Sequence, residues 1–248
     1  MEGISSNKKI LSGSQVFSEL IDNKNRDLWD YLRKQYDFQL EESFEEGFLT
    51  YFKGDTVIIE VDLDQPSPAA FTHELLHVYM KSQGLKIVWN MKDRIENDSD
   101  LQSVFSTSLR VHIGNCLEHV KMLPLFLERG YSREDFLMDY HERTMMETDV
   151  KSLEDNYYCK GGVVLKTVDN YIGKYFAMKA SANPEFDYSQ ALMGFKAIDP
   201  SLYQILDGFW HDWLKYQIGD PQEKYLNFMD SFLENIKNWW RDNKKSPS

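Results

Sequence analysis

Near the start of the chain, apolar residues recur at helical spacing. From about Ser14 to Tyr36 they repeat every three or four positions, and the polar run Asp22–Arg26 interrupts them. An amphipathic helix buries such a stripe against a core, and a polar break ends it. The pattern predicts two short helices in this segment.

The periodicity then changes to one typical of strands. Phe48–Phe52 and Thr56–Val61 are rich in aromatic and β-branched residues, and Lys53–Asp55 between them contains a glycine suited to a turn. Two such runs joined by a short glycine-containing loop are typical of an antiparallel hairpin. Pro66 and Pro68 end this small sheet, because proline cannot continue a strand ladder.

A long helix is expected directly after the hairpin. Ser67 followed by Pro68 is a favourable helix start, because serine caps the first turn and proline is tolerated at the first helical position. The helix should run to about Gln83, where Gly84 provides a stop.

The rest of the chain reads mainly as helix. A second long helix is predicted from about Ser106 to Arg129, closed by Gly130, and Ser132 begins another. Beyond Val163 the periodic stretches are all helical, and the last two apolar stripes are joined across Gly219–Pro221. The tryptophans of these last stripes are expected to pack in the core. The fold class is therefore predicted as α+β and mainly helical, with a small antiparallel sheet beside the first long helix and a helical region at the C-terminal end.

Residues 73–77 of the first long helix read H-E-x-x-H. At 100° per residue, His73 and His77 are separated by about 40° around the helix, so both imidazoles leave the same side one turn apart. Glu74 projects from the flank of this pair. The opposite side carries apolar residues that should hold the helix against the core: Phe71, Leu75, Val78 and Tyr79.

This arrangement points to a metal-dependent hydrolase. Two histidines suit zinc, and catalytic zinc sites take three protein ligands and keep a fourth position for water. The sequence therefore predicts Zn²⁺ bound by His73 and His77, with Glu74 as the general base that accepts the proton of the water.

The motif, on a helix that follows a strand, resembles the zincin superfamily of zinc metallopeptidases. The resemblance covers about residues 40–145 and implies a zincin-like fold, a zinc ion and the hydrolysis of peptide bonds. A strand that leads into the motif helix could hold an extended peptide beside the metal. The chain lacks the compact continuation with a third histidine shortly after His77, so the third ligand must come from a later element.

The second long helix offers two candidates for that ligand. His112, Asn115 and His119 fall on one stripe, with Glu118 about 100° away from His119. His119 would complete a three-histidine site, and Glu118 would make the two-histidine, one-glutamate set of thermolysin-like zincins. The spacing favours His119 and leaves Glu118 as the alternative. The core face of this helix is expected to be Leu109, Ile113, Cys116, Val120 and Leu123.

Supporting roles fall on a few polar residues. Asn115 could orient a ligand imidazole, since metal-bound histidines donate their second nitrogen's hydrogen to a fixed partner. Tyr140 and His141, or Tyr131, are the nearest candidates in sequence for stabilising an oxyanion. Cys116 is interpreted as a small buried apolar residue with no chemical role.

These predictions give a simple division of the chain. A zincin-like metal-binding domain is expected at residues 14–145, with a helical region at 146–243 packed on it in one continuous globular unit. The ends, 1–13 and 244–248, are polar and expected to be flexible.

Composition narrows the possible partners. Asp and Glu outnumber Lys and Arg by 40 to 28, and the net charge of -12 repels phosphate backbones and anionic lipids, so neither nucleic acid nor a membrane is an expected partner. No apolar run has the length of a signal peptide or a membrane span, and two cysteines cannot form a multi-bridge framework. We therefore expect a cytoplasmic protein.

The favoured function is a zinc metallopeptidase with a peptide or protein substrate. Two alternatives use the same residues: a non-catalytic regulatory or structural protein with a zincin fold, and a zinc hydrolase of non-peptide amides or esters. The substrate class rests on the resemblance, because the same activated water attacks all of these carbonyl groups.

Overall fold

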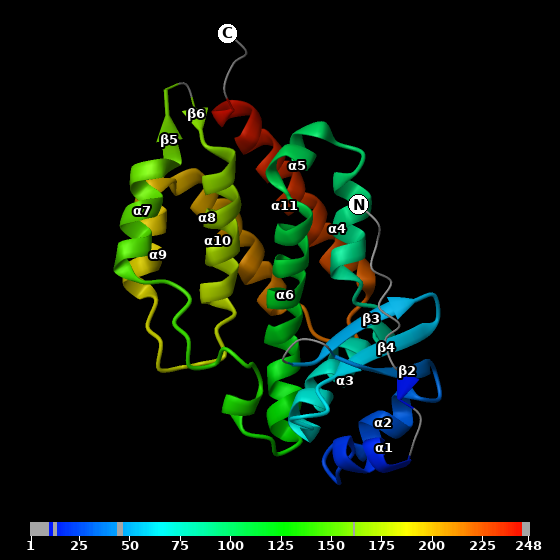
Figure 1. The fold of residues 1–248 in the computed structure, drawn as a ribbon. Coiled ribbons are helices and arrows are strands. Elements are labelled where there is room, and N and C mark those ends of the chain that lie inside the picture. Colours follow the sequence, from blue (N-terminus) through cyan, green and yellow to red (C-terminus); the bar gives the residue numbers. More distant parts are fainter. Residues whose placement is uncertain (1–9, 12–13, 44–46, 161, 245–248) are drawn as a thin grey trace, which may run out of the picture. The chain divides into compact units, whose positions relative to one another are not determined.

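Figure 1 shows the computed structural model of the chain. It describes residues 10–11, 14–43, 47–160 and 162–244. Most of the two termini that were predicted to be flexible lies outside these residues.

The chain forms two compact units, and each contains two separate stretches of sequence. The first unit is made of residues 1–83 and 121–140, and the second of residues 84–120 and 141–248. This division differs from the predicted sequential one at residue 145, because 84–120 belong with the C-terminal helices.

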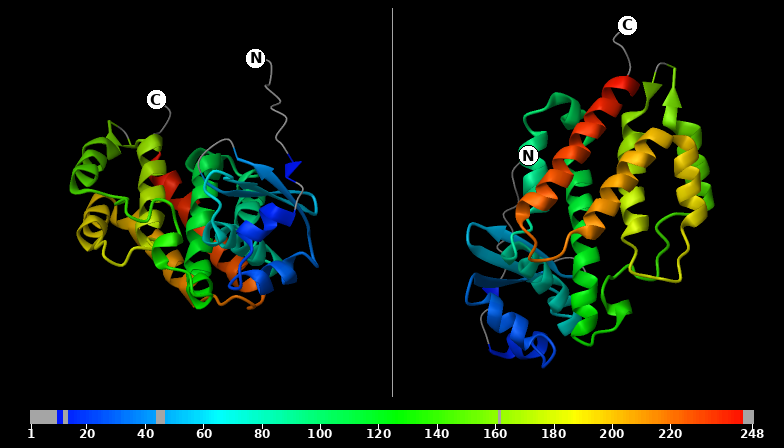
Figure 2. Two further views of the ribbon diagram at one scale, coloured as in Figure 1. Left: turned by 60° about the horizontal axis from the view of Figure 1, so that its bottom comes forward. Right: turned by 180° about the vertical axis from the view of Figure 1, so that it is seen from behind.

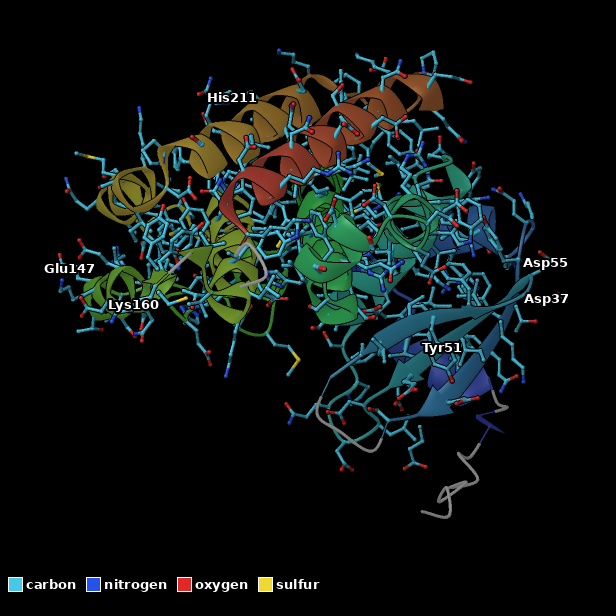
Figure 3. All side chains as sticks on the ribbon, turned by 90° about the horizontal axis from the view of Figure 1, so that it is seen from above. Asp37, Tyr51, Asp55, Glu147, Lys160 and His211 are labelled. Atoms are coloured by element: carbon cyan, nitrogen blue, oxygen red, sulfur yellow. The ribbon has the colours of Figure 1, made fainter. Side chains whose placement is uncertain are left out.

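The first unit contains a four-stranded sheet in the order β1-β2-β4-β3. Its strands are β1 (Ile10–Leu11), β2 (Asp37–Glu42), β3 (Leu49–Lys53) and β4 (Thr56–Val61). The predicted hairpin is confirmed as β3 and β4, which are antiparallel. Figure 3 shows Asp37 and Asp55 at the same end of this sheet, as the pairing of Asp37 with Thr56 requires.

The expectation of a purely antiparallel sheet is wrong, because β2 runs parallel to β4. Burial explains the order of the strands. Five of the six residues of β4 are buried, whereas β3 alternates between exposed and half-buried positions. The more apolar strand of the hairpin therefore occupies the interior of the sheet, and β3 is left at its edge.

The helices of the first unit begin and end close to where the sequence predicts. The two short helices are α1 (Ser14–Leu20) and α2 (Arg26–Leu32), and the motif helix is α3 (Pro68–Ser82). The Ser67 hydroxyl accepts a hydrogen bond from the Ala70 backbone N–H at 3.2 Å, and Gly84 has a φ of 85°. The serine N-cap and the glycine after the last turn are both features expected at the ends of a helix. Figure 1 shows α3 beside the β3–β4 hairpin.

Helix α3 is buried more completely than its amphipathic pattern predicts. The expected core residues Phe71, Leu75 and Val78 are fully buried, but His73 and Glu74 on the other side are only 9% and 8% exposed. The side that carries the histidines is therefore covered as well.

The second long helix is α6 (Thr107–Glu128), and its predicted bounds are confirmed. Its residues up to Val120 belong to the second unit, and the rest belong to the first. Of its predicted core face, Leu109, Ile113 and Cys116 are buried, whereas Val120 and Leu123 are half-buried. After it, Ser132 begins only one turn of 3-10 helix at Arg133–Asp135, in the first unit.

The second unit is mainly helical. Its other elements are α4 (Ile87–Ile95), α5 (Ser99–Val104), α7 (Glu147–Tyr157), β5 (Tyr158–Cys159), β6 (Gly162–Val163), α8 (Leu165–Lys179), α9 (Ser189–Ile198), α10 (Pro200–Lys215) and α11 (Gln222–Asn243). Helices α10 and α11 pack side by side (Figure 2). The tryptophans of these two helices are buried, as predicted, whereas His211 projects outward from α10 (Figure 3). Within the described part of the chain, none of the helices is both long enough and apolar enough to cross a bilayer.

A buried carboxylate joins several helices of the second unit. Asp199 caps α10 by accepting a hydrogen bond from the Leu202 backbone N–H at 2.8 Å. It also accepts from the Tyr157 hydroxyl at 2.9 Å and from the Trp239 indole N–H at 3.1 Å. Burial, together with the charge of Asp199, raises the pKa of Tyr157. One side chain thus satisfies donors from α7, α10 and α11.

Asp199→Ala should lower the free energy of unfolding by about 3 kcal/mol, because it leaves three donors in the interior without their acceptor. Urea denaturation of the purified protein measures this loss. The half-buried Asp212, which pairs with Lys215 on α10, provides the control, and Asp212→Ala should change stability by no more than about 0.5 kcal/mol. Equal losses in the two variants would contradict this role for Asp199.

Candidate metal centre

His73 and His77 converge because they lie one turn apart on a well-capped helix. Their Nε2 atoms are 3.2 Å apart, and their ring centroids are 5.0 Å apart. Positions i and i+4 of a helix lie one above the other, so this approach follows directly from the H-E-x-x-H spacing.

The distance between these two nitrogens fits a shared metal ion. Zinc binds imidazole nitrogen at about 2.0–2.1 Å, and two such ligands of a tetrahedral ion stand about 3.3 Å apart. The observed 3.2 Å agrees with this value. The spacing is therefore compatible with a shared ion such as zinc, and it is also that of a hydrogen bond between the two imidazoles.

His119 completes a group of three histidines that could hold a metal ion. One possible ligand atom from each of His73, His77 and His119 lies within 4.8 Å of the others. Glu118, the alternative third ligand, is not a member of this group. Its charge instead adds to the effect of burial that raises the pKa of Tyr225 in the second unit. His112 is also outside the group, and its Nε2 lies 3.1 Å from the backbone oxygen of Gly173.

Glu74 lies next to the histidines in a desolvated position. Burial raises the pKa of its carboxyl group above the ordinary value, while the charge of His77 and the nearby polar groups of Thr50 act in the opposite direction. Thr50 belongs to β3, so the carboxylate faces the edge strand of the sheet. The position of Glu74 between a ligand histidine and an edge strand suits a group that moves a proton.

An aromatic residue that the sequence did not single out lies against the first histidine. The ring of Phe136 is 4.8 Å from the ring of His73, and Phe136 is itself buried. It follows the single 3-10 turn in a segment without periodicity, so no sequence signal could have connected it to the motif. Its contact limits the positions that the His73 ring can adopt.

The remaining site candidates lie in more open positions. Asn115 is exposed on α6, and Tyr140 and His141 occupy the turn after the 3-10 helix, where Tyr140 is half-buried and His141 exposed. Their supporting roles remain predictions. Tyr131 is different, because it is buried and its hydroxyl donates a hydrogen bond to Asp22 at 2.8 Å. That hydroxyl is therefore already engaged, which makes Tyr131 a poor candidate for stabilising an oxyanion.

A separate groove of about 850 Å³ in the first unit is unrelated to the histidines. It lies between α2, α3 and the end of α6, and α3 contributes Leu76, Tyr79 and Gln83 to its lining. None of the residues with a predicted chemical role lines it. The reactive groups of α3 therefore belong to a different side of the helix from this groove.

Comparison of the chain with protein-family models, with curated proteins and with solved structures finds no match. Functional inference therefore rests on the residues of the site. Three imidazoles that can share one ion, next to a buried carboxylate, can hold a divalent metal and move a proton beside it.

The protein should bind one zinc ion per chain, and His73→Ala, His77→Ala and His119→Ala should each weaken this binding by at least about 100-fold, because each removes a ligand. Calorimetric titration of the metal-free protein measures the affinity. Glu118→Ala and His211→Ala are the matched controls and should bind as the unaltered protein does. Loss of binding in Glu118→Ala with retention in His119→Ala would overturn the assignment of the third ligand.

Proposed function

We propose that the protein is a zinc-dependent metallopeptidase with a zincin-like fold. The observation that carries this proposal is the group of three histidines with Glu74 beside it. Imidazole nitrogen is a preferred ligand of zinc, and a site with three protein ligands keeps a coordination position open.

Each residue of the proposed site has a defined task in this reaction. When bound, zinc supplies Lewis-acid chemistry, which lowers the pKa of a coordinated water and polarises a carbonyl group. His73, His77 and His119 hold the ion. Glu74 accepts a proton from the attacking water and delivers it to the leaving amine. Tyr140 and His141 are the proposed groups for stabilising the negative charge on the carbonyl oxygen.

The edge strand β3 supports a peptide as the substrate. In the described residues β3 pairs only with β4, so its other edge is free to accept an extended chain. Helix α3, which carries Glu74, packs against this strand, so the edge strand lies next to the proposed base. A peptide added to β3 would place its backbone carbonyl groups beside the carboxylate.

The arrangement of the elements supports a zincin-like fold. A mixed sheet ends in an antiparallel edge strand, and the helix with the H-E-x-x-H motif follows that hairpin directly. The third histidine comes from a later long helix, α6. This order agrees with the resemblance to zincins, in which the motif lies on a helix that follows a strand and a third ligand is needed.

Glu74→Gln should abolish peptide hydrolysis, with a decrease in kcat of at least about 1,000-fold, because the amide cannot accept the proton of the water. Zinc binding should be retained, since all three histidines remain. Hydrolysis of a mixed library of unstructured peptides, followed by mass spectrometry, measures the activity. Glu147→Gln, at an exposed position at the start of α7 (Figure 3), controls for the loss of a carboxylate elsewhere.

The same assay distinguishes the alternatives. Unchanged proteolysis in Glu74→Gln would exclude the proposed base. A protein that binds zinc but cleaves no peptide would be tested on simple amides and esters. Activity on those alone would place the same site in a different class of hydrolase, and inactivity on every substrate would favour a non-catalytic protein.

A further inference from the structure

A buried polar cluster in the first unit surrounds Thr72, the residue before His73. Asn25 and Thr72 are both fully buried. The Asn25 side-chain amide donates hydrogen bonds to the Leu20 backbone oxygen at 2.9 Å and to the Thr72 hydroxyl oxygen at 3.0 Å. This cluster therefore ties α3 to the segment between α1 and α2.

Tyr131 connects the same cluster to the segment after α6. The Thr72 hydroxyl has one hydrogen, and two acceptors lie within donating distance of it: the Tyr131 hydroxyl oxygen at 3.1 Å and the Pro68 backbone oxygen at 2.6 Å. The Tyr131 hydroxyl in turn donates to Asp22 at 2.8 Å. Burial, with a further contribution from the charge of Asp22, raises the pKa of Tyr131, so its hydroxyl keeps its proton. The bond between Thr72 and Tyr131 thus joins the motif helix to residues that directly follow α6.

An aromatic chain leads from Tyr131 back to the metal centre. The Tyr131 ring stacks on Phe126 of α6 with centroids 5.0 Å apart, and Phe126 meets Phe136 edge-on at 5.2 Å. Phe136 then contacts the ring of His73 at 4.8 Å. Tyr131 is therefore connected to His73 by two routes, through the backbone of α3 and through packed rings.

Metal coordination makes the rotation of α3 about its axis critical. Side-chain atoms on the outside of a helix lie about 6 Å from its axis, so a rotation of about 10° moves them by about 1 Å. Metal–ligand distances tolerate only about 0.2 Å. The rotation of α3 must therefore be fixed if its two imidazoles are to share one ion with His119 of α6.

We infer that Thr72 and Tyr131 are positioning residues for the metal centre, whose hydrogen bond fixes the rotation of α3 relative to the end of α6. This inference rests on the proposed metal site, and it assigns the two residues no contact with substrate or metal. Outer groups that orient metal ligands typically contribute 10–100-fold to metal affinity when removed.

A purely structural role would produce a different result. Tyr171 in the second unit is a matched control for Tyr131. It is also buried, and its hydroxyl also donates a hydrogen bond, to the Phe195 backbone oxygen at 2.7 Å. Tyr171→Phe and Tyr131→Phe each remove one buried hydroxyl, so both should lower the Tm. Only Tyr131→Phe should also change the affinity for zinc.

The experiment measures zinc affinity by competition with a chromophoric chelator, at a temperature at which every variant is folded by circular dichroism. Tyr131→Phe and Thr72→Val should each weaken zinc binding by about 10-fold. Thr72→Ser retains the hydroxyl and should bind zinc within about twofold of the unaltered protein. Tyr171→Phe should bind as tightly as the unaltered protein.

Each outcome has a definite meaning. Unaltered zinc affinity in both Tyr131→Phe and Thr72→Val would overturn the inference and leave the proposed function intact. Equal weakening in Tyr171→Phe would also overturn it, because affinity would then follow stability alone. If Tyr131→Phe does not fold, the comparison of Thr72→Val with Thr72→Ser decides. Failure of the unaltered protein to bind zinc would overturn the metal site and this inference together.

Discussion

The convergence of two imidazoles of α3 on one point is the constraint on which the rest of the site depends. The 3.2 Å between the Nε2 atoms of His73 and His77 is maintained only if the helix does not bend and the two rings keep their orientations, and the approach to His119 also requires that the helix does not rotate. The structure meets this demand by covering the helix on nearly every side. Its apolar residues fill the core, and on the side with the histidines His73 is buried and His77 half-buried. Rigidity and metal binding are therefore requirements on the same fifteen-residue helix.

That rigidity has an energetic cost, because the site buries polar groups. Glu74 is 8% exposed, and a carboxylate in such a position is unfavourable unless hydrogen bonds or opposite charges compensate for the lost water. The charge of His77 and the nearby polar groups of Thr50 provide part of this compensation. A bound cation would provide more. We therefore expect metal binding to be linked to folding, since an ion that binds only the native state shifts the equilibrium toward it.

The sequence predicts those features of the site that are local. The bounds of α3 follow from Ser67 and Gly84 at its ends, and the convergence of the two histidines follows from their spacing alone. The hairpin of β3 and β4 can also be predicted from the sequence, because a turn-forming segment lies between two strand-like runs. For the third ligand, the sequence limits the candidates to two neighbouring residues of α6, His119 and Glu118, and does not decide between them. A difference of 100° around a helix can be resolved only when the orientation of that helix in the fold is known.

Features that depend on long-range contacts cannot be predicted from local patterns in the sequence. Strand β2 has the polar sequence DFQLEE, and its parallel pairing with β4 is specified by neither segment alone. The contacts of Tyr131 and Phe136 are of the same kind. Tyr131 has the residue type of an oxyanion donor, but its hydroxyl lies among buried groups contributed by segments more than fifty residues away. Residue type and nearness in sequence thus suggested a chemical role, whereas burial and hydrogen bonding indicate that Tyr131 acts on the site through α3.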